Sequence, residues 1–313
     1  MMNKYGFKNK QINTLLRILL WNNHFYGICV AGLAISSALK LTGNLPSISF
    51  LMMAYISTVV YYTNAYFKES LNVQNRDRSN WYQKNKNYLK KRQGILMAVL
   101  LILISKGVLE NPQLLRLDIF TSVFIAFSLI FSILYNHTNL KKYGILKSLA
   151  IAFVWTILGG YMPLYFNHVL GYSIITSIST QVLYLIQLFL FIFLLAVLFD
   201  IKDMQNDEKN NIRTIPLQFG LERIKKGLIW PFIFISVSID IIQSTQSFFS
   251  VIAFFIQGLF YLILYWAALL AIKEKSISKS ILLIDGLMIV KSLSLIFLWY
   301  FTQSNFFNFF IFV

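Results

Sequence analysis

The chain has 313 residues, of which 57% are hydrophobic, 17% aromatic and only 13% charged, and its mean hydropathy is +0.64. A soluble domain carries about 25% charged residues, so this composition indicates a chain whose solvent is largely lipid. One cysteine and three scattered histidines exclude an intramolecular disulfide framework and argue against a zinc or haem site. The formal net charge of +16 lies in short Lys and Arg clusters between apolar stretches, which indicates membrane topology rather than nucleic acid binding.

In chain order, nine stretches are apolar enough to cross a membrane, since a spanning helix needs about 20 mostly apolar residues. Their apolar runs are continuous rather than alternating, so we expect an all-α polytopic membrane protein and not a β-barrel. We interpret residues 1–313 as a single integral membrane domain. The expected spans lie near 18–39, 46–64, 94–110, 117–135, 145–165, 173–199, 228–247, 249–271 and 281–301.

The distribution of Lys and Arg predicts the orientation of these spans. With the N-terminus in the cytoplasm, the cytoplasmic segments contain 24 of the 28 basic residues, and this asymmetry is the usual signature of the cytoplasmic side. We therefore expect a cytoplasmic N-terminus and an external C-terminus, in what we take to be the cytoplasmic membrane of a bacterium. The two longest cytoplasmic loops, where we expect the function to lie, are 65–93 and 200–227.

Three aspartates follow directly on the sixth expected span, at positions 200, 203 and 207. On a helix this spacing places all three carboxylates on one face. Carboxylates that share a face repel one another unless a cation neutralises them, and Mg²⁺ binds proteins through one or two carboxylates together with substrate phosphates. We therefore predict a catalytic Mg²⁺ site at Asp200, Asp203 and Asp207. The alternative is a solvated helix end whose acids pair with Lys202 and Lys209.

The residues that follow these aspartates complete a motif. Asp-x2-Asp-x3-Asp, followed by Arg213-Thr214-x-Pro216-x2-Phe219-Gly220, resembles the second aspartate motif of the UbiA prenyltransferase superfamily. The number of spans, the two long loops, and Tyr135 at the end of the fourth span with two lysines just beyond it are also similar to that family. The resemblance implies nine transmembrane helices bundled around a central cavity open to lipid.

This resemblance also implies an activity. Members of the family transfer an isoprenoid from a polyprenyl diphosphate to a hydrophobic aromatic or lipid acceptor, with Mg²⁺ as the cofactor. The departing pyrophosphate develops negative charge, which metal ions and cationic side chains stabilise. The residues to which the resemblance assigns diphosphate binding near the second motif and after the fourth span are Tyr135, Lys141, Lys142 and Arg213.

The first aspartate motif departs from the family pattern, Asn-Asp-x2-Asp-x3-Asp. Its three aspartate positions hold Ala65, Lys68 and Asn72. Lys68 cannot ligate a metal while charged, but its ammonium suits pyrophosphate as a point charge. Two alternatives therefore stay open beside transfer, namely a membrane terpene cyclase of the same family and a non-catalytic pseudoenzyme that binds an isoprenoid or lipid. The residues expected to contact the diphosphate here are Asn64, Lys68, Asn72, Asn75 and Arg76.

Two ionisable residues, Asp285 and Lys291, lie within the ninth expected span, where charge is costly and often functional. Six residues separate them by about 240° around a helix, so they do not pair within it. We expect a structural role for both.

Overall fold

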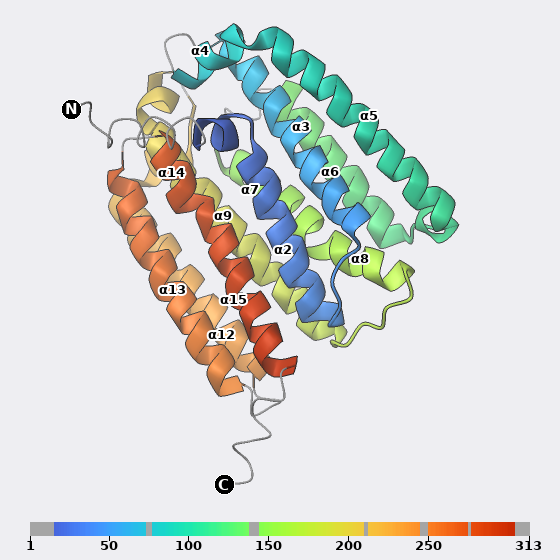
Figure 1. Ribbon diagram of the computed structural model, residues 1–313. Coiled ribbons are helices and arrows are strands. Elements are labelled where there is room, and N and C mark those ends of the chain that lie inside the picture. The colour runs from blue at the N-terminus through green and yellow to red at the C-terminus, as the bar shows by residue number, and fades with distance from the viewer. Residues whose placement is uncertain are drawn as a thin grey trace, which may run out of the picture. The chain divides into compact units, whose positions relative to one another are not determined.

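The computed structural model describes residues 16–72, 77–137, 144–209, 212–244, 250–274 and 277–303. Within these ranges the ordered elements are α-helices with short 3₁₀ and π segments, and none is a β-strand (Figure 1). This confirms the all-α membrane fold. Seven helical segments are long and apolar enough to cross a membrane by length and composition: His24–Thr42, Lys86–Glu110, Gly144–Val169, Ile178–Met204, Leu221–Gln243, Phe255–Lys273 and Ser278–Phe301.

The two remaining expected spans also fall on helices. Ile119–Leu134 is apolar but shorter than the other seven, and the stretch 46–64 lies on α3 (Ile48–Asn72), a helix of 25 residues that ends in polar side chains. Each of the nine expected ranges therefore overlaps a helix in the described part of the chain.

The chain divides into two compact units, and the boundary between them falls within α2 (His24–Thr42). Unit 1 comprises Met1–Ala31 and Ser47–Arg116, and unit 2 comprises Gly32–Pro46 and Leu117–Val313.

In unit 1, α3 packs against the two helices that follow it (Figure 1). The side chain of Gln93 on α5 donates a hydrogen bond to the carbonyl of Val60 on α3 at 2.9 Å, and this bond fixes the register between the two helices. Besides α3, the described elements wholly within this unit are α4 (Asp77–Lys84), α5 (Lys86–Glu110) and η1 (Pro112–Leu115).

In unit 2, the long helix α9 (Ile178–Lys209) packs against helices on several sides, including α7 (Gly144–Thr156) and α12 (Trp230–Ser244). A Cβ at Gly160 would lie 2.8 Å from the Cδ2 of Leu188 on α9, so the leucine side chain would have to shift to admit any larger residue. The other elements are α6 (Ile119–His137), η3 (Ile157–Tyr161), α8 (Met162–Val169), α10 (Ile215–Phe219), α11 (Leu221–Ile224), η4 (Lys225–Ile229), α13 (Ser250–Lys273), α14 (Ile277–Ile284) and α15 (Gly286–Gln303).

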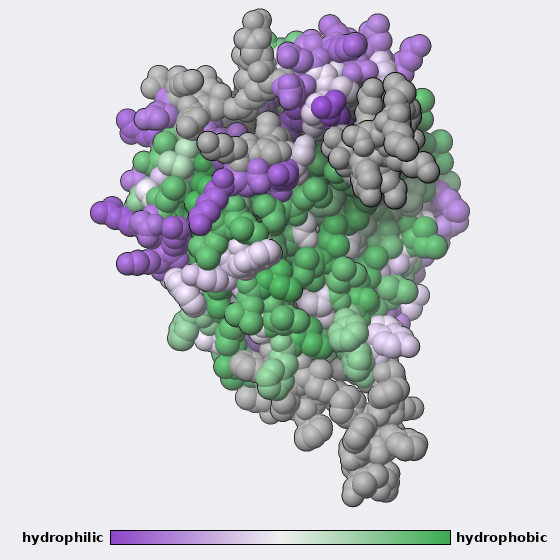
Figure 2. Space-filling view, turned by 60° about the vertical axis from the view of Figure 1, so that its left-hand side comes forward, coloured by the Kyte–Doolittle hydropathy of each residue, from purple (hydrophilic) through white to green (hydrophobic). Residues whose placement is uncertain are grey.

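Large apolar side chains cover much of the protein surface. On α5, Ile95 and Ile102 are 64% and 65% exposed, although that helix is among those apolar enough to span a membrane. Hydrophobic residues likewise make up a broad part of the face seen in Figure 2. Exposed apolar area on this scale marks contact with another apolar phase, here the lipid of the bilayer.

Candidate functional site

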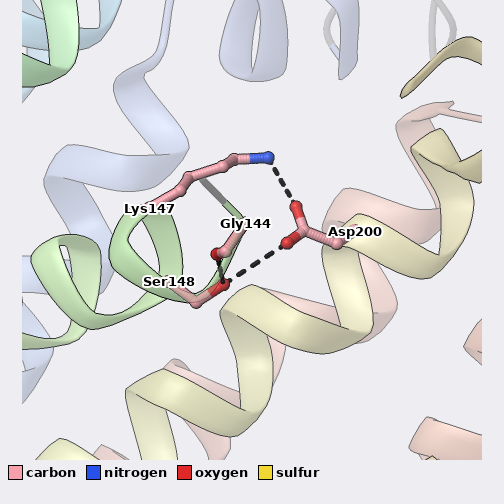
Figure 3. Close-up of polar contacts among 4 residues, drawn as sticks. All are labelled: Gly144, Lys147, Ser148 and Asp200. Carbon is pink, nitrogen blue, oxygen red and sulfur yellow. Dashed lines mark hydrogen bonds and ion pairs between the residues drawn. The ribbon is translucent and has the colours of Figure 1, made fainter. Parts of the chain in front are cut away.

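The C-terminal end of α9 carries the three aspartates, and a lysine from α7 reaches the first of them. Lys147 Nζ donates to Asp200 Oδ1 at 2.5 Å, and Ser148 Oγ donates to Asp200 Oδ2 at 3.3 Å (Figure 3). The Asp200 residue is only 1% exposed. Both of its carboxylate oxygens are thus engaged by α7, one of them in a buried ion pair.

The ammonium of Lys147 acts on the whole acidic face. Its electrostatic interactions run first to Asp200 and then to Asp207 and Asp203. Asp207 is buried and Asp203 is half-buried. An internal cation therefore reduces the repulsion among three carboxylates that the helix places on one face.

The expected Mg²⁺ ligands can be compared with this arrangement. Among the described residues, no group of three or more His, Cys, Asp or Glu side chains is placed to hold a metal ion. Mg²⁺ needs only one or two carboxylates when substrate phosphates supply further oxygens. Asp203 and Asp207, one helical turn apart, fit that smaller requirement, while Lys147 and Ser148 each donate one hydrogen bond to an oxygen of Asp200.

The Arg-Thr-x-Pro segment packs on the start of α7. The backbone N–H of Gly144 donates to the carbonyl of Arg213 at 3.1 Å, and a Cβ at Gly144 would lie 2.3 Å from the Cα of Thr214. Only glycine allows this contact. Thr214 is fully buried, Pro216 stands in the first turn of α10, and Gly220 ends that helix with a φ of +77°. The motif residues thus form a turn that fixes the loop beside Lys147.

Of the predicted diphosphate residues, three have side chains that the structure describes. Arg213 is exposed in unit 2, and Asn64 and Lys68 are exposed on consecutive turns of α3 in unit 1. For Asn72 and Tyr135 the structure describes the helical backbone but not the side chain. Asn75, Arg76, Lys141 and Lys142 lie outside the described residues.

Two arginines of the basic loop have roles that sequence reasoning missed. In unit 1, Arg78 places its guanidinium carbon 3.6 Å from the ring centroid of Tyr66. Arg92 donates to Asn22 Oδ1 and, at 2.9 Å, to Thr63 Oγ1, so it ties the start of α5 to α3 and to the residues before α2. From the sequence alone, both are only two of the 24 basic residues assigned to the cytoplasmic side.

The hydrogen bond between Arg92 and Thr63 belongs to a network that also includes Asn23, a residue with a strained backbone. Asn23 has a φ of +64°, and its amide donates to Thr63 Oγ1 at 3.0 Å and to Tyr82 Oη at 2.7 Å. No local pattern in the sequence signals these contacts, because they join residues about 40 and 60 positions apart.

Lys147, Ser148 and Gly144 were also missed. From the sequence alone, Lys147 is only one of the 24 basic residues assigned to the cytoplasmic side, because nothing near position 147 reveals that α7 meets α9 at Asp200. A lysine so close to the start of a spanning helix is the one signal that sequence reasoning had available.

The fold and this site together define a class of protein: an all-α membrane protein with an acidic helix end beside a buried lysine. A sequence model of the UbiA prenyltransferase family matches residues 25–285, and the chain belongs to that family. Comparison with curated protein sequences gives no match.

Solved structures share the fold at low sequence identity. A UbiA homologue from Archaeoglobus fulgidus bound to GPP and Mg²⁺ is 13% identical, with a TM-score of 0.57 over 91% of this chain and 98% of that one. The same comparison with a homologue bound to DMAPP and Mg²⁺ gives 14% identity and a TM-score of 0.56, over 90% and 99% of the two chains. Digeranylgeranylglyceryl phosphate synthase is 18% identical, with a TM-score of 0.50 over 91% and 95%.

Proposed function

We propose that the chain is a membrane prenyltransferase that transfers an isoprenoid from a polyprenyl diphosphate to a hydrophobic aromatic or lipid acceptor. The proposal places this reaction at the cytoplasmic face of a bacterial membrane. The observation that carries it is the acidic face of α9, which ends a spanning helix and is followed by the Arg-Thr-x-Pro turn, in which Thr214 and Pro216 are buried. The binding of GPP or DMAPP with Mg²⁺ by A. fulgidus homologues of the same fold supports it.

Within this proposal, Asp203 and Asp207 would hold Mg²⁺ together with diphosphate oxygens. Mg²⁺, when bound, supplies positive charge that stabilises the departing pyrophosphate. Lys147 fixes Asp200 and lowers the repulsion on the acidic face, so Asp200 positions the cluster rather than ligating the ion. The buried apolar side chains of α9, such as Leu194 and Leu198, keep water out of the protein interior next to the aspartates.

The remaining diphosphate contacts stay proposals drawn from the family resemblance. Lys68 is proposed to replace part of a metal site as a point charge, because its ammonium is exposed on α3 where the family has an aspartate. The other residues proposed to contact the diphosphate are Asn64, Asn72, Asn75, Arg76, Tyr135, Lys141, Lys142 and Arg213.

The test is pyrophosphate release by the purified protein in nanodiscs with Mg²⁺ and a labelled polyprenyl diphosphate. We expect release from the unaltered chain and a loss of at least about a hundredfold in Asp203→Asn, because the amide removes the anionic oxygen that a metal requires. Asp118→Asn is the matched control: the same chemical change at an exposed aspartate that caps α6, where asparagine also caps, leaves release unchanged.

The outcomes separate the three candidate functions. Organic-phase products that form only with an added acceptor support transfer, and products formed without an acceptor indicate a cyclase. Absence of pyrophosphate release with every isoprenoid length would overturn both enzymatic functions and leave a non-catalytic binding protein.

A further inference from the structure

The start of α5 carries exposed lysines that the proposed reaction does not use. Four lysines stand between positions 84 and 91, and all are exposed: Lys84, Lys86, Lys90 and Lys91. In the described part of the chain, none of the four forms an ion pair with a carboxylate. Like charges at this spacing repel one another, and an anion held between them would remove the repulsion.

The buried side of the helix determines where these lysines point. Leu89 is 1% exposed, and Gln93 donates its hydrogen bond to Val60 on α3. Arg92 is likewise held inward by its hydrogen bond to Thr63. These contacts fix the rotation of α5 about its own axis, so the lysine ammonium groups remain exposed.

Two of the lysines continue into an apolar stripe on the same helix. At about 3.6 residues per turn, Lys86, Lys90, Met97 and Leu101 fall within about 60° of one another around the axis. Met97 is 42% exposed and Leu101 is 59% exposed. We call these four residues the α5 stripe. Its outward surface changes from ammonium groups to apolar side chains within about two helical turns.

The dimensions of the α5 stripe match those of one lipid molecule. Met97 and Leu101 lie about 10 and 16 Å further along the axis than Lys90, at a rise of about 1.5 Å per residue. The hydrocarbon of one leaflet is about 15 Å deep, because the whole core measures about 30 Å. An acyl chain that starts at the level of Lys90 therefore runs past both apolar side chains. Lysine side chains are long enough to hold their ammonium groups at the headgroup level.

The charge of the α5 stripe determines which lipid it favours. A zwitterionic headgroup carries a positive group beside its phosphate and has no net charge, so it gains little from two ammonium groups. An anionic phospholipid brings a phosphate whose charge is not compensated, and lysines near such a headgroup attract it. A soluble anion would satisfy the lysines but would leave Met97 and Leu101 uncovered.

We propose that the α5 stripe binds an anionic phospholipid, with the phosphate between Lys86 and Lys90 and an acyl chain along Met97 and Leu101. Tyr88, which is 54% exposed between the two lysines in sequence, adds an amphipathic ring at the headgroup level. The proposal concerns unit 1 alone and does not depend on prenyl transfer, so the Asp203→Asn variant is expected to bind the lipid as the unaltered chain does.

A fluorescent label beside the α5 stripe tests this proposal in the full chain. Ala98→Cys, combined with Cys29→Ala at the buried native cysteine, gives one thiol for a bimane label at an exposed position next to Met97. The labelled protein is placed in phosphatidylcholine vesicles that contain a small, equal fraction of brominated phosphatidylglycerol or brominated phosphatidylcholine. Bromine quenches bimane only at short range. We expect phosphatidylglycerol to quench at least about fivefold more efficiently, the preference that one lysine gives at an anionic surface.

Two paired substitutions decide the outcome. Lys86→Gln/Lys90→Gln should lower the quenching ratio at least about threefold, and folding should be kept because glutamine forms helices as well as lysine does. Arg223→Gln/Lys226→Gln removes the same charge from exposed positions in unit 2 and should leave the ratio unchanged. A ratio near one without these substitutions, no fall in Lys86→Gln/Lys90→Gln, or an equal fall in both pairs would overturn the proposal and leave the lysines as solvated charges.

Discussion

At the scale of single residues, Lys147 decides the character of the acidic face. A spacing of three aspartates on one helix predicts mutual repulsion and a need for a cation, and α7 supplies one within the protein itself. The chain thereby differs from a site in which metal ions alone offset the carboxylates. The buried pair is costly to break, because removal of one partner leaves the other charge uncompensated in the interior.

Lys147→Met should therefore lower the free energy of unfolding by about 3–5 kcal/mol, the range for breaking a buried pair from one side. The double variant Lys147→Met/Asp200→Leu should recover most of that loss, because it removes the uncompensated carboxylate. Denaturant titration of the purified protein measures both. Lys106→Met, which breaks an exposed pair of 3.7 Å with Glu110, is the control and should change stability little. A double variant as unstable as the single one would contradict this account of Lys147.

At the scale of elements, the contact between α7 and the Arg213-Thr214 segment positions the acidic face. Asp207 and the segment are joined directly, since the N–H of Ile212 donates to the carbonyl of Asp207 at 2.8 Å. The same segment accepts the N–H of Gly144 at the start of α7. The turn after α9 and the start of α7 are thus held together one helical turn from Lys147.

Gly144→Ala should disturb this contact, because the added Cβ would lie 2.3 Å from a backbone atom that cannot rotate away. We expect a loss of stability of about 1–3 kcal/mol, as for other overpacked sites, together with reduced pyrophosphate release. Gly94→Ala is the matched control: it lies on α5 with nothing within 4 Å of the added atom, and there alanine is favoured by up to about 1 kcal/mol. Equal thermal unfolding temperatures for the two variants would show that the contact is unimportant.

At the scale of the whole molecule, the sequence predicts those features that depend on neighbouring residues and misses contacts between residues far apart in the chain. Spans and the three aspartates of α9 were predictable, because apolar length and helical spacing are properties of contiguous sequence. The partners of those aspartates were not, since Lys147 and Asp200 are 53 residues apart and meet only when α7 packs on α9. Likewise, Lys291 was noticed within its span, but its neighbours Phe191 and Phe260 come from other helices.

The orientation of the chain in the membrane is a prediction from charge alone. Since 24 of the 28 Lys and Arg residues fall in segments assigned to one side, that side should be the cytoplasm. Alkaline phosphatase, which is active only outside the cytoplasm, should be active when fused after Val313 or after Gly171 and inactive after Lys273. Green fluorescent protein, which needs the cytoplasm to fluoresce, should give the opposite pattern at the same positions. Fluorescence of the Val313 fusion would show an even number of spans or an external N-terminus, and the acidic face of α9 would then need to be reassigned to the other side.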